Sequence, residues 1–426
     1  MSALAISERL TGLWRHPDFL RLWAGQSISV VGSEITLFAM PLVAVLTLDA
    51  AAGQMGLLLA AGYAPDLLVS LLAGAWVDRV RRRPVLIATD IGRAALLASI
   101  PLAWAFDLLT MAQLYAVAFG VGVFSVFFRA AYFTMLPSLV EREFLVEGNG
   151  KFELSRSVAR IAGPGLAGWL VRLLGAPVVL LLDAVSFLVS ALCIRAIRAP
   201  EPPAPSGKRA IRGEIGEGLR FAFGNPMLRA MTATAGTFNL FGGLIGALFV
   251  LYATRELGIG AGLLGTVIAV GAIGALMGAL LAARLSGRIG IGPAAVGGIV
   301  LASGSQTLIA LAGGPAPVAA AILVANQALF GFGAMVFSIN TQGLRQVVTP
   351  VRLLGRLQAS SAVVSMGTLP FGALLGGKLG EAIGLRPAIA IGAAGALLAV
   401  PWLFFSPVRT LRELPVPAEE AAMAAR

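Results

Sequence analysis

Long apolar runs follow one another along almost the whole chain and are separated by short polar segments. A helix needs about 20 predominantly apolar residues to cross the hydrocarbon core of a bilayer. Twelve windows of roughly that size fall at 19–48, 54–77, 85–105, 111–135, 152–174, 177–197, 227–253, 263–285, 292–312, 318–341, 359–380 and 387–405. The pattern predicts an all-α membrane protein with twelve transmembrane helices. An even number of spans places both termini on the same side of the membrane.

Composition agrees with a lipid solvent, because 58% of the residues are hydrophobic and only 12% are charged. A soluble protein carries about twice that share of charge. The single cysteine, Cys193, and the single histidine, His16, argue against a disulfide framework and against a zinc site built from these residue types. We therefore expect no metal and no cofactor. The polar residues 1–19 lack the apolar core of a cleaved secretory signal.

The net charge of +11 follows the predicted topology. Most of the 32 Lys and Arg residues lie in the two termini and in alternate loops, which makes that side cytoplasmic by the positive-inside rule. The opposite loops hold Arg172, Arg255, Lys378 and Arg386. Both termini are expected to be cytoplasmic. A nucleic-acid partner is not expected, because the basic residues are scattered over many short segments and do not gather on one surface.

One long polar interruption divides the spans into six and six. It begins with a Pro-rich connector, 199–207, and continues with apolar residues at every fourth position, which is the period of an amphipathic helix. We expect that helix either to lie on the inner leaflet of the membrane or to be a plain linker. The predicted domains are a six-helix bundle at 1–197, a cytoplasmic linker at 198–226, a second bundle at 227–406 and a cytoplasmic tail at 407–426.

The two predicted bundles also resemble each other. Pro164 in the fifth span and Pro370 in the eleventh lie in similar surroundings of small residues. Internal repeats of this kind are typical of transporters that bind their substrate between the halves, near the bilayer midplane. The pattern predicts two pseudo-symmetric six-helix bundles.

The polar loop after the second span carries the most specific motif, G-x-x-x-D-R-x-x-R-R, at Gly74, Asp78, Arg79, Arg82 and Arg83. A glycine permits close helix approach, an aspartate can cap a helix or bind an arginine, and the arginines hold the loop inside. The motif resembles the loop signature of the major facilitator superfamily between its second and third helices. The resemblance implies the major facilitator fold and a cytoplasmic gate at this loop. The alternative is a merely positive inner loop.

The fifth span resembles the antiporter signature of the same superfamily at Gly163, Pro164 and Gly168, with alanine replacing glycine at 159 and 167. The alternative is ordinary packing of small residues. Together with the segment that begins at His16, these motifs make nearly the whole chain similar to the drug and siderophore exporters of the superfamily. The resemblance implies proton-coupled efflux of an amphipathic small molecule, drug-like, macrolide-like or siderophore-like, by alternating access.

Ionisable groups inside the spans are the best candidates for a site, because a charge at the bilayer centre costs about 2.5–3.5 kcal/mol even on the lenient insertion scale. Glu34 and Asp66 fall near the middle of their spans, and Glu34 flanks a polar face of the first span. Either acid handles substrate or protons, or is a permanently paired structural group. The candidates for substrate binding or proton coupling are Glu34, Asp66, Arg160, Gln26, Ser33, Arg129, Asn239, Asn326 and Asn340. For Asp90 and Arg93, near the inner end of the third span, we favour snorkelling or pairing with the polar motif loop, and for Asp183 we favour a structural role.

The sequence thus predicts a multi-pass protein of the plasma or inner membrane, a monomer whose partners are a small-molecule substrate, protons and the lipid bilayer. An importer or facilitator of the same fold is the first alternative. A non-transporting receptor or channel is an alternative of a different class. A membrane-embedded enzyme would need a clustered acid, His or Cys site, and no catalytic residue is expected. The Gly372–Lys378 stretch spells a P-loop skeleton but lies inside an apolar span, so ATP is not expected as the energy source.

Overall fold

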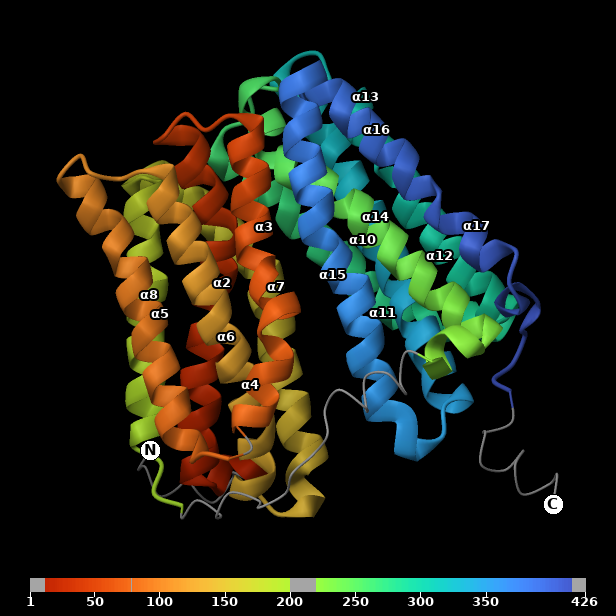
Figure 1. Ribbon diagram of the computed structural model, residues 1–426, viewed down its shortest axis with the longest axis horizontal. Coiled ribbons are helices and arrows are strands. Elements are labelled where there is room, and N and C mark those ends of the chain that lie inside the picture. The colour runs from red at the N-terminus through yellow and green to blue at the C-terminus, as the bar shows by residue number, and fades with distance from the viewer. Residues whose placement is uncertain (1–11, 78, 200–219, 416–426) are drawn as a thin grey trace, which may run out of the picture. The chain divides into compact units, whose positions relative to one another are not determined.

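The computed structural model describes residues 12–77, 79–199 and 220–415, which are almost entirely helical (Figure 1). The first part contains η1 (Gly12–Arg15), α2 (Pro17–Leu46), α3 (Ala52–Leu68), α4 (Ser70–Val77), α5 (Arg82–Ala105), α6 (Met111–Leu139), η2 (Arg142–Phe144), α7 (Leu145–Leu174) and α8 (Ala176–Arg195). The second contains α10 (Pro226–Arg255), α11 (Ala261–Ile289), α12 (Ile291–Ser305), α13 (Thr307–Leu311), α14 (Ala316–Val348), α15 (Val351–Ile383), α16 (Leu385–Leu397), α17 (Ala399–Phe404) and η3 (Pro407–Thr410). The predicted all-α class is confirmed.

Within the described ranges, nine helical segments are long and apolar enough to cross a membrane. They are α2, α5, α6, α8, α10, α11, α14 and the two pairs α12 with α13 and α16 with α17. The other three predicted spans correspond to α3 with α4, to α7 and to α15. α3 has only 17 residues because the helix is interrupted at Val69, before α4 begins. α7 carries several charges. The count of twelve therefore stays a prediction.

Single glycines form three of the tight connections between helices. Gly175 joins α7 to α8, Gly290 joins α11 to α12, and Gly384 joins α15 to α16, each with a φ between 83° and 97°. Residues with a Cβ rarely adopt this left-handed region, so glycine is what allows one helix to end and the next to begin at once. Gly175 and Gly384 hold equivalent positions in the two predicted halves, which is consistent with a repeat.

The chain folds as two compact units, one within residues 1–48 and 68–209 and the other within 49–67 and 210–426. Segment 49–67 belongs to the sequence's first predicted bundle, yet it packs with the second unit. A Cβ on Gly56 of α3 would lie 2.5 Å from the carbonyl oxygen of Ala373 and 2.9 Å from Cα of Gly377. Of the predicted amphipathic linker helix, residues 220–224 are helical and 211–219 lie outside the described residues. The domain boundaries stay a prediction.

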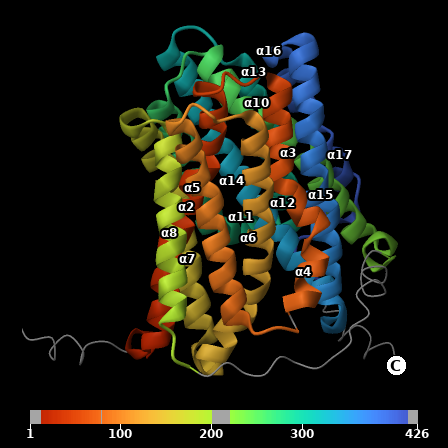
Figure 2. The same cartoon turned by 60° about the vertical axis from the view of Figure 1, so that its left-hand side comes forward.

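In the first unit, α2 packs along both α8 and α7, and α5 packs on α8 and α6 (Figures 1 and 2). The buried apolar cluster toward the start of α2 includes Phe19, Leu22, Leu86 and Phe152, each under 7% exposed. A glycine face of α2 meets α8, because a Cβ on Gly25 would come within 2.9 Å of the Cβ of Cys193. Small residues therefore set how closely the helices of this unit approach.

The second unit is built from α10 against α15 and from α14 against α11 and α12. Here too glycines bring backbones together. A Cβ on Gly376 of α15 would lie 2.5 Å from the carbonyl oxygen of Leu244 in α10. A Cβ on Gly331 of α14 would overlap the carbonyl oxygen of Gly271 in α11. Lipid tails are as apolar as leucine, so such close van der Waals contact is a main source of helix association in membranes.

Gly331→Ala is expected to destabilise the second unit by about 1–3 kcal/mol, the usual cost of overpacking, because backbone atoms of α11 cannot move aside as a flexible side chain could. The measurement is the thermal unfolding temperature of the purified protein in detergent. Gly343→Ala on the same helix is the matched control, since a Cβ there would meet no heavy atom within 4 Å. Equal unfolding temperatures for the two variants would contradict the close α11–α14 contact.

Candidate functional site

A cluster of buried polar side chains lies where α2, α5 and α8 pack together in the first unit. Asp90 and Arg93 stand one turn apart on α5 and form an ion pair, with side chains 0% and 7% exposed. Asp183 of α8 is 1% exposed. Its Oδ2 accepts a hydrogen bond from Thr36 Oγ1 of α2 (2.6 Å), and its Oδ1 accepts one from Ser186 Oγ (2.8 Å). Three charged groups are therefore enclosed among three helices.

Glycine and aromatic residues make room for these charges. A Cβ on Gly32 of α2 would overlap Oδ1 of Asp183, so only glycine at this position lets the carboxyl group lie against α2. The Arg93 guanidinium lies over the rings of Phe128 and Phe187, 4.3 and 4.0 Å from their centroids. Such contacts each contribute about 0.5–2 kcal/mol and partly offset the loss of water around the cation.

Gln26, a predicted site residue, belongs to the same region. Its Nε2 donates to Ser190 Oγ of α8 (3.1 Å), and Ser190 is a neighbour of Asp90. The polar residues of α2 therefore contact more than one neighbouring helix. Gln26 and Thr36 are buried against α8.

Glu34 lies on the other side of α2, where this helix meets α7. It is half-buried, and the Cβ of Glu34 would be only 2.5 Å from a Cβ placed on Gly163. Arg160, one turn before Gly163, is exposed and attracts Glu34 electrostatically. The glycine of the predicted antiporter motif thus provides the space for the strongest candidate acid. Pro164 and Gly168 of the same motif are buried in α7.

The remaining candidates of the first predicted bundle are more scattered. Ser33 is half-buried on α2, next to Glu34 in sequence, and Asp66 is half-buried on α3, in the segment that packs with the second unit. Arg129 is exposed on α6 and repels Arg93 electrostatically. These three candidates therefore lie on three different helices.

The three candidate asparagines of the second unit all hold helices together. Asn239 Nδ2 donates to the carbonyl oxygen of Ser365 (2.8 Å), which links α10 to α15. Asn326 Nδ2 donates to the carbonyl oxygen of Ser305 (2.9 Å), at the break between α12 and α13. Asn340 Oδ1 accepts from Ser286 Oγ (2.6 Å), which links α14 to α11. Their amide groups satisfy backbone and hydroxyl groups that water cannot reach.

The predicted gate motif lies at the end of α4 and the start of α5, and its Asp78 lies outside the described residues. A Cβ on Gly74 would meet no heavy atom within 4 Å, so no described helix presses on it. Arg79 is exposed and Arg82 is half-buried. Arg83 Nη2 donates to the carbonyl oxygen of Ala199 (2.6 Å), which ties the motif to the start of the linker.

The start of the linker is held from a second direction by Asp18, at the beginning of α2. Its Oδ2 accepts the backbone N–H of Ala199 (2.8 Å), and its Oδ1 accepts that of Arg198 (3.1 Å). Arg21 forms an ion pair with the same carboxylate (2.6 Å). The gate motif and the first span thus bind the same short stretch of chain.

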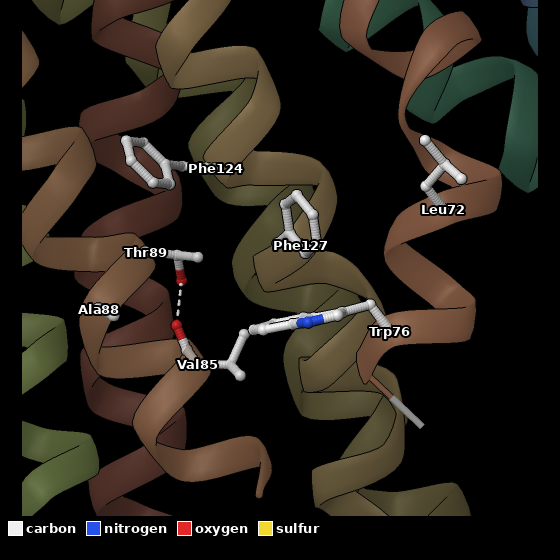
Figure 3. Close-up of a pocket in the computed structure, with 7 residues that line it drawn as sticks. All are labelled: Leu72, Trp76, Val85, Ala88, Thr89, Phe124 and Phe127. Carbon is white, nitrogen blue, oxygen red and sulfur yellow. Dashed lines mark hydrogen bonds between the residues drawn. The ribbon is translucent and has the colours of Figure 1, made fainter. Parts of the chain in front are cut away.

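An apolar pocket of about 470 Å³ opens between α4, α5 and α6 (Figure 3). It is lined by Leu72, Trp76, Val85, Ala88, Thr89, Phe124 and Phe127. The rings of Trp76 and Phe127 meet edge to face, with centroids 5.4 Å apart. The Thr89 hydroxyl donates a hydrogen bond to the Val85 carbonyl oxygen (2.8 Å). The pocket offers contact surface for an apolar group and presents almost no free polar atom.

Sequence reasoning missed the burial of Asp90, Arg93 and Asp183. The available signal was an acid and a base three residues apart in an otherwise apolar helix, which is a pairing distance on one helix face. The polar face of the first span drew attention to Glu34 instead. Which helix faces α5 and α8 could not be read from a single sequence.

Helices long enough to span a bilayer, with charged groups enclosed among them, define the class as a multi-pass helical membrane protein. The family profile described as Major Facilitator Superfamily matches residues 22–369. The chain belongs to this superfamily and is a transporter of the cell membrane. The fold, the family and the membrane location inferred from the sequence motifs are therefore confirmed.

Curated relatives point the same way. The chain is 28% identical over 413 residues to the multidrug efflux pump Tap of Mycolicibacterium fortuitum, which covers 94% of this chain and 98% of that protein. It is 27% identical over 395 residues to the uncharacterized MFS-type transporter YfiS of Bacillus subtilis, with 89% and 90% covered. These relatives are transporters.

Solved structures share the fold at low sequence identity. A bacterial homologue of the iron transporter ferroportin has a TM-score of 0.74 at 16% identity, covering 92% of this chain and 99% of that one. The nucleoside transporter NupG has a TM-score of 0.73 at 14% identity, covering 91% of this chain and 98% of that one. At this identity the likeness shows the fold alone.

Gly163→Ala is expected to reduce transport by at least tenfold, because the added methyl group would push Glu34 and α2 away from α7. A misplacement of about 1 Å can cost about 100-fold in rate where the displaced group acts in the reaction, and Glu34 is the candidate for such a group. The measurement is substrate efflux from cells that express equal amounts of each protein. Gly150→Ala on the same helix is the control, since a Cβ there would meet no heavy atom within 4 Å. Parallel loss in both variants would contradict a specific role for the contact.

Proposed function

We propose that this transporter exports an amphipathic small molecule in exchange for protons, by alternating access of a central site. The observation that carries the proposal is Glu34, an acid inside a membrane span that is packed against the glycine of α7 and attracted by Arg160. Intramembrane acids are costly and usually mark ion or substrate paths. The similarity to a protein named as a multidrug efflux pump supports the direction and the class of substrate.

The apolar lining of the pocket between α4, α5 and α6 supports an amphipathic cargo, because aromatic and aliphatic walls favour the apolar part of a ligand. The gate motif at the end of α4 would stabilise one conformational state through its arginines. The driving force would be the proton gradient, which supplies about 2.3 kcal/mol per charge for each 100 mV, plus the pH term. The runner-up is an importer or facilitator of the same fold.

A susceptibility and accumulation panel in an efflux-deficient host tests the direction of transport. Expression of the protein is expected to lower the cell content of amphipathic probes such as ethidium and erythromycin, and a protonophore is expected to restore it. Substrate accumulation in place of depletion would support the importer. Depletion that a protonophore leaves unchanged would contradict proton coupling.

Glu34→Gln is expected to keep folding and membrane insertion and to lose most proton-coupled efflux, because the amide cannot exchange a proton. The measurement is drug-driven proton release in vesicles that contain the purified protein. Glu153→Gln is the matched control, since Glu153 is an exposed acid on α7 that pairs with Arg156 (3.9 Å). Unchanged proton release in Glu34→Gln would remove Glu34 from the coupling site.

Asp78→Asn is expected to shift the balance between the two access states, because the gate motif would lose one charge that can bind an arginine or cap a helix. The measurement is labelling of single cysteines introduced near each membrane surface, in a background without Cys193. Asp107→Asn, at the opposite end of α5, serves as a control with the same chemical change. Identical labelling of wild type and Asp78→Asn on both sides would contradict the gate.

A further inference from the structure

We propose that the cluster of Asp90, Arg93 and Asp183 is a binding site for one exchangeable proton. The binding of this proton stands on the charges and contacts of the cluster itself. Its use in export rests on the proposed function. The site is separate from Glu34, which faces α7, whereas the cluster lies between α2, α5 and α8.

The first argument is charge balance. Two carboxyl groups and one guanidinium are each less than 10% exposed, which leaves one negative charge in excess if both acids are ionised. A buried charge without a partner costs several kcal/mol, and in practice a buried acid takes up a proton instead. The cluster is therefore neutral when one proton is bound.

The second argument is that no other positive charge among the described residues neutralises the excess negative charge of the two acids. The charged groups that act on the two acids are Arg93 and the acids themselves. From α6, the exposed Arg129 acts on Arg93 by repulsion. On α2, the acid Glu34 interacts electrostatically with Arg160 of α7. The other titratable side chain beside this α2–α8 contact is Cys193, which is neutral as a thiol.

The third argument places the proton on Asp183. Arg93 is ion-paired with Asp90, which favours the ionised form of that acid, and the Ser190 hydroxyl lies beside the same carboxyl group. Asp183 forms its hydrogen bonds with the hydroxyl groups of Thr36 and Ser186, and a hydroxyl can donate to a carboxylate or accept from a carboxylic acid. Ser186 Oγ also lies 2.8 Å from the carbonyl oxygen of Asp183, so its hydrogen has a second acceptor when the carboxyl group is protonated.

One oxygen of Asp90 adds to this argument. Its Oδ2 is fully buried and accepts no hydrogen bond at the usual distance within the described residues, although the Ser190 hydroxyl interacts with the same carboxyl group. A buried oxygen of this kind is costly unless a donor reaches it. This oxygen therefore raises the cost of ionising both acids at once.

The cluster is connected through α2 to Glu34, the acid of the proposed function. Thr36, which donates a hydrogen bond to Asp183, and Glu34, which meets α7, are two residues apart and thus about 200° apart around the helix. Uptake of the proton by Asp183 would change the hydrogen bond at Thr36, on the same helix as Glu34. The two acids are thereby linked through one helix.

Infrared difference spectroscopy of the purified protein in lipid vesicles, between neutral and alkaline pH, tests the proposal. At neutral pH, wild type is expected to show the C=O stretching band of one protonated carboxylic acid in the cluster, beside the separate band of any proton that Glu34 carries. Asp183→Asn and Asp90→Asn are each expected to lose this band, because one acid and Arg93 then form a neutral pair. Glu34→Gln and the exposed Glu153→Gln are expected to keep it. A band that persists in Asp183→Asn, or that disappears in Glu34→Gln, would overturn the assignment.

Thr36→Val keeps the proposal testable should an aspartate variant fail to fold. Valine is close to threonine in shape and removes the hydroxyl group, so the band of a protonated Asp183 is expected to move to higher frequency. An unmoved band would exclude Asp183 as the proton carrier. Circular dichroism and gel filtration of each variant report its folding.

Ethidium uptake into everted vesicles separates this inference from the proposed function. If wild type takes up ethidium under an imposed pH gradient, Asp183→Asn is expected to lose the gradient dependence and to retain downhill exchange. Full gradient dependence in Asp183→Asn would exclude the cluster from coupling. A carboxylic acid band in a wild type whose export ignores the gradient would leave the proton site standing and refute the proposed function.

Discussion

Close contact between helix backbones at glycines is the interaction on which the rest of this structure depends. In lipid, apolar side chains gain little by meeting one another, so helices associate where backbones can approach and polar groups can pair. Gly331 against Gly271 in the second unit and Gly25 against Cys193 in the first are such places. The same device creates the space for charge, because Gly32 admits the carboxyl group of Asp183 and Gly163 admits Glu34.

Helix α2 occupies a central position in the chemistry of the first unit. One side of α2 carries Gln26 and Thr36, both hydrogen-bonded to α8, and another side carries Glu34 against α7. A shift or rotation of this helix therefore changes the surroundings of two different acids at once. Moving α2 away from α8 would take the Thr36 hydroxyl from the buried carboxyl group of Asp183, and an unsatisfied buried acceptor is costly.

Hydrophobic length was enough to predict the helical class and the membrane location, and the motifs of the loop after the second span and of the fifth span were enough to predict the family. Side-chain contacts were not, because a period of 3.6 residues fixes which residues share a face but does not name the helix that the face meets. Asn326 is an example of a contact that the sequence could not predict. From the sequence it is a polar residue inside a span. The structure shows that its amide donates to the Ser305 carbonyl oxygen, where α12 ends before α13 begins. Asp183 is the opposite case, since its full burial depends on Gly32, which is far away in sequence.

The two units share their helix joints and differ in where they bury charge. Gly175 and Gly384 make the same kind of connection at equivalent positions, whereas the buried charged residues of the described chain, Asp18, Asp90, Arg93 and Asp183, all belong to the first unit. The polar side chains of the second unit that are buried to the same degree carry amides and hydroxyls, and its Arg345 is partly buried. Among these buried groups, the acids that can gain or lose a proton lie in the first unit, so the proposed proton coupling would act first on the contacts of that unit.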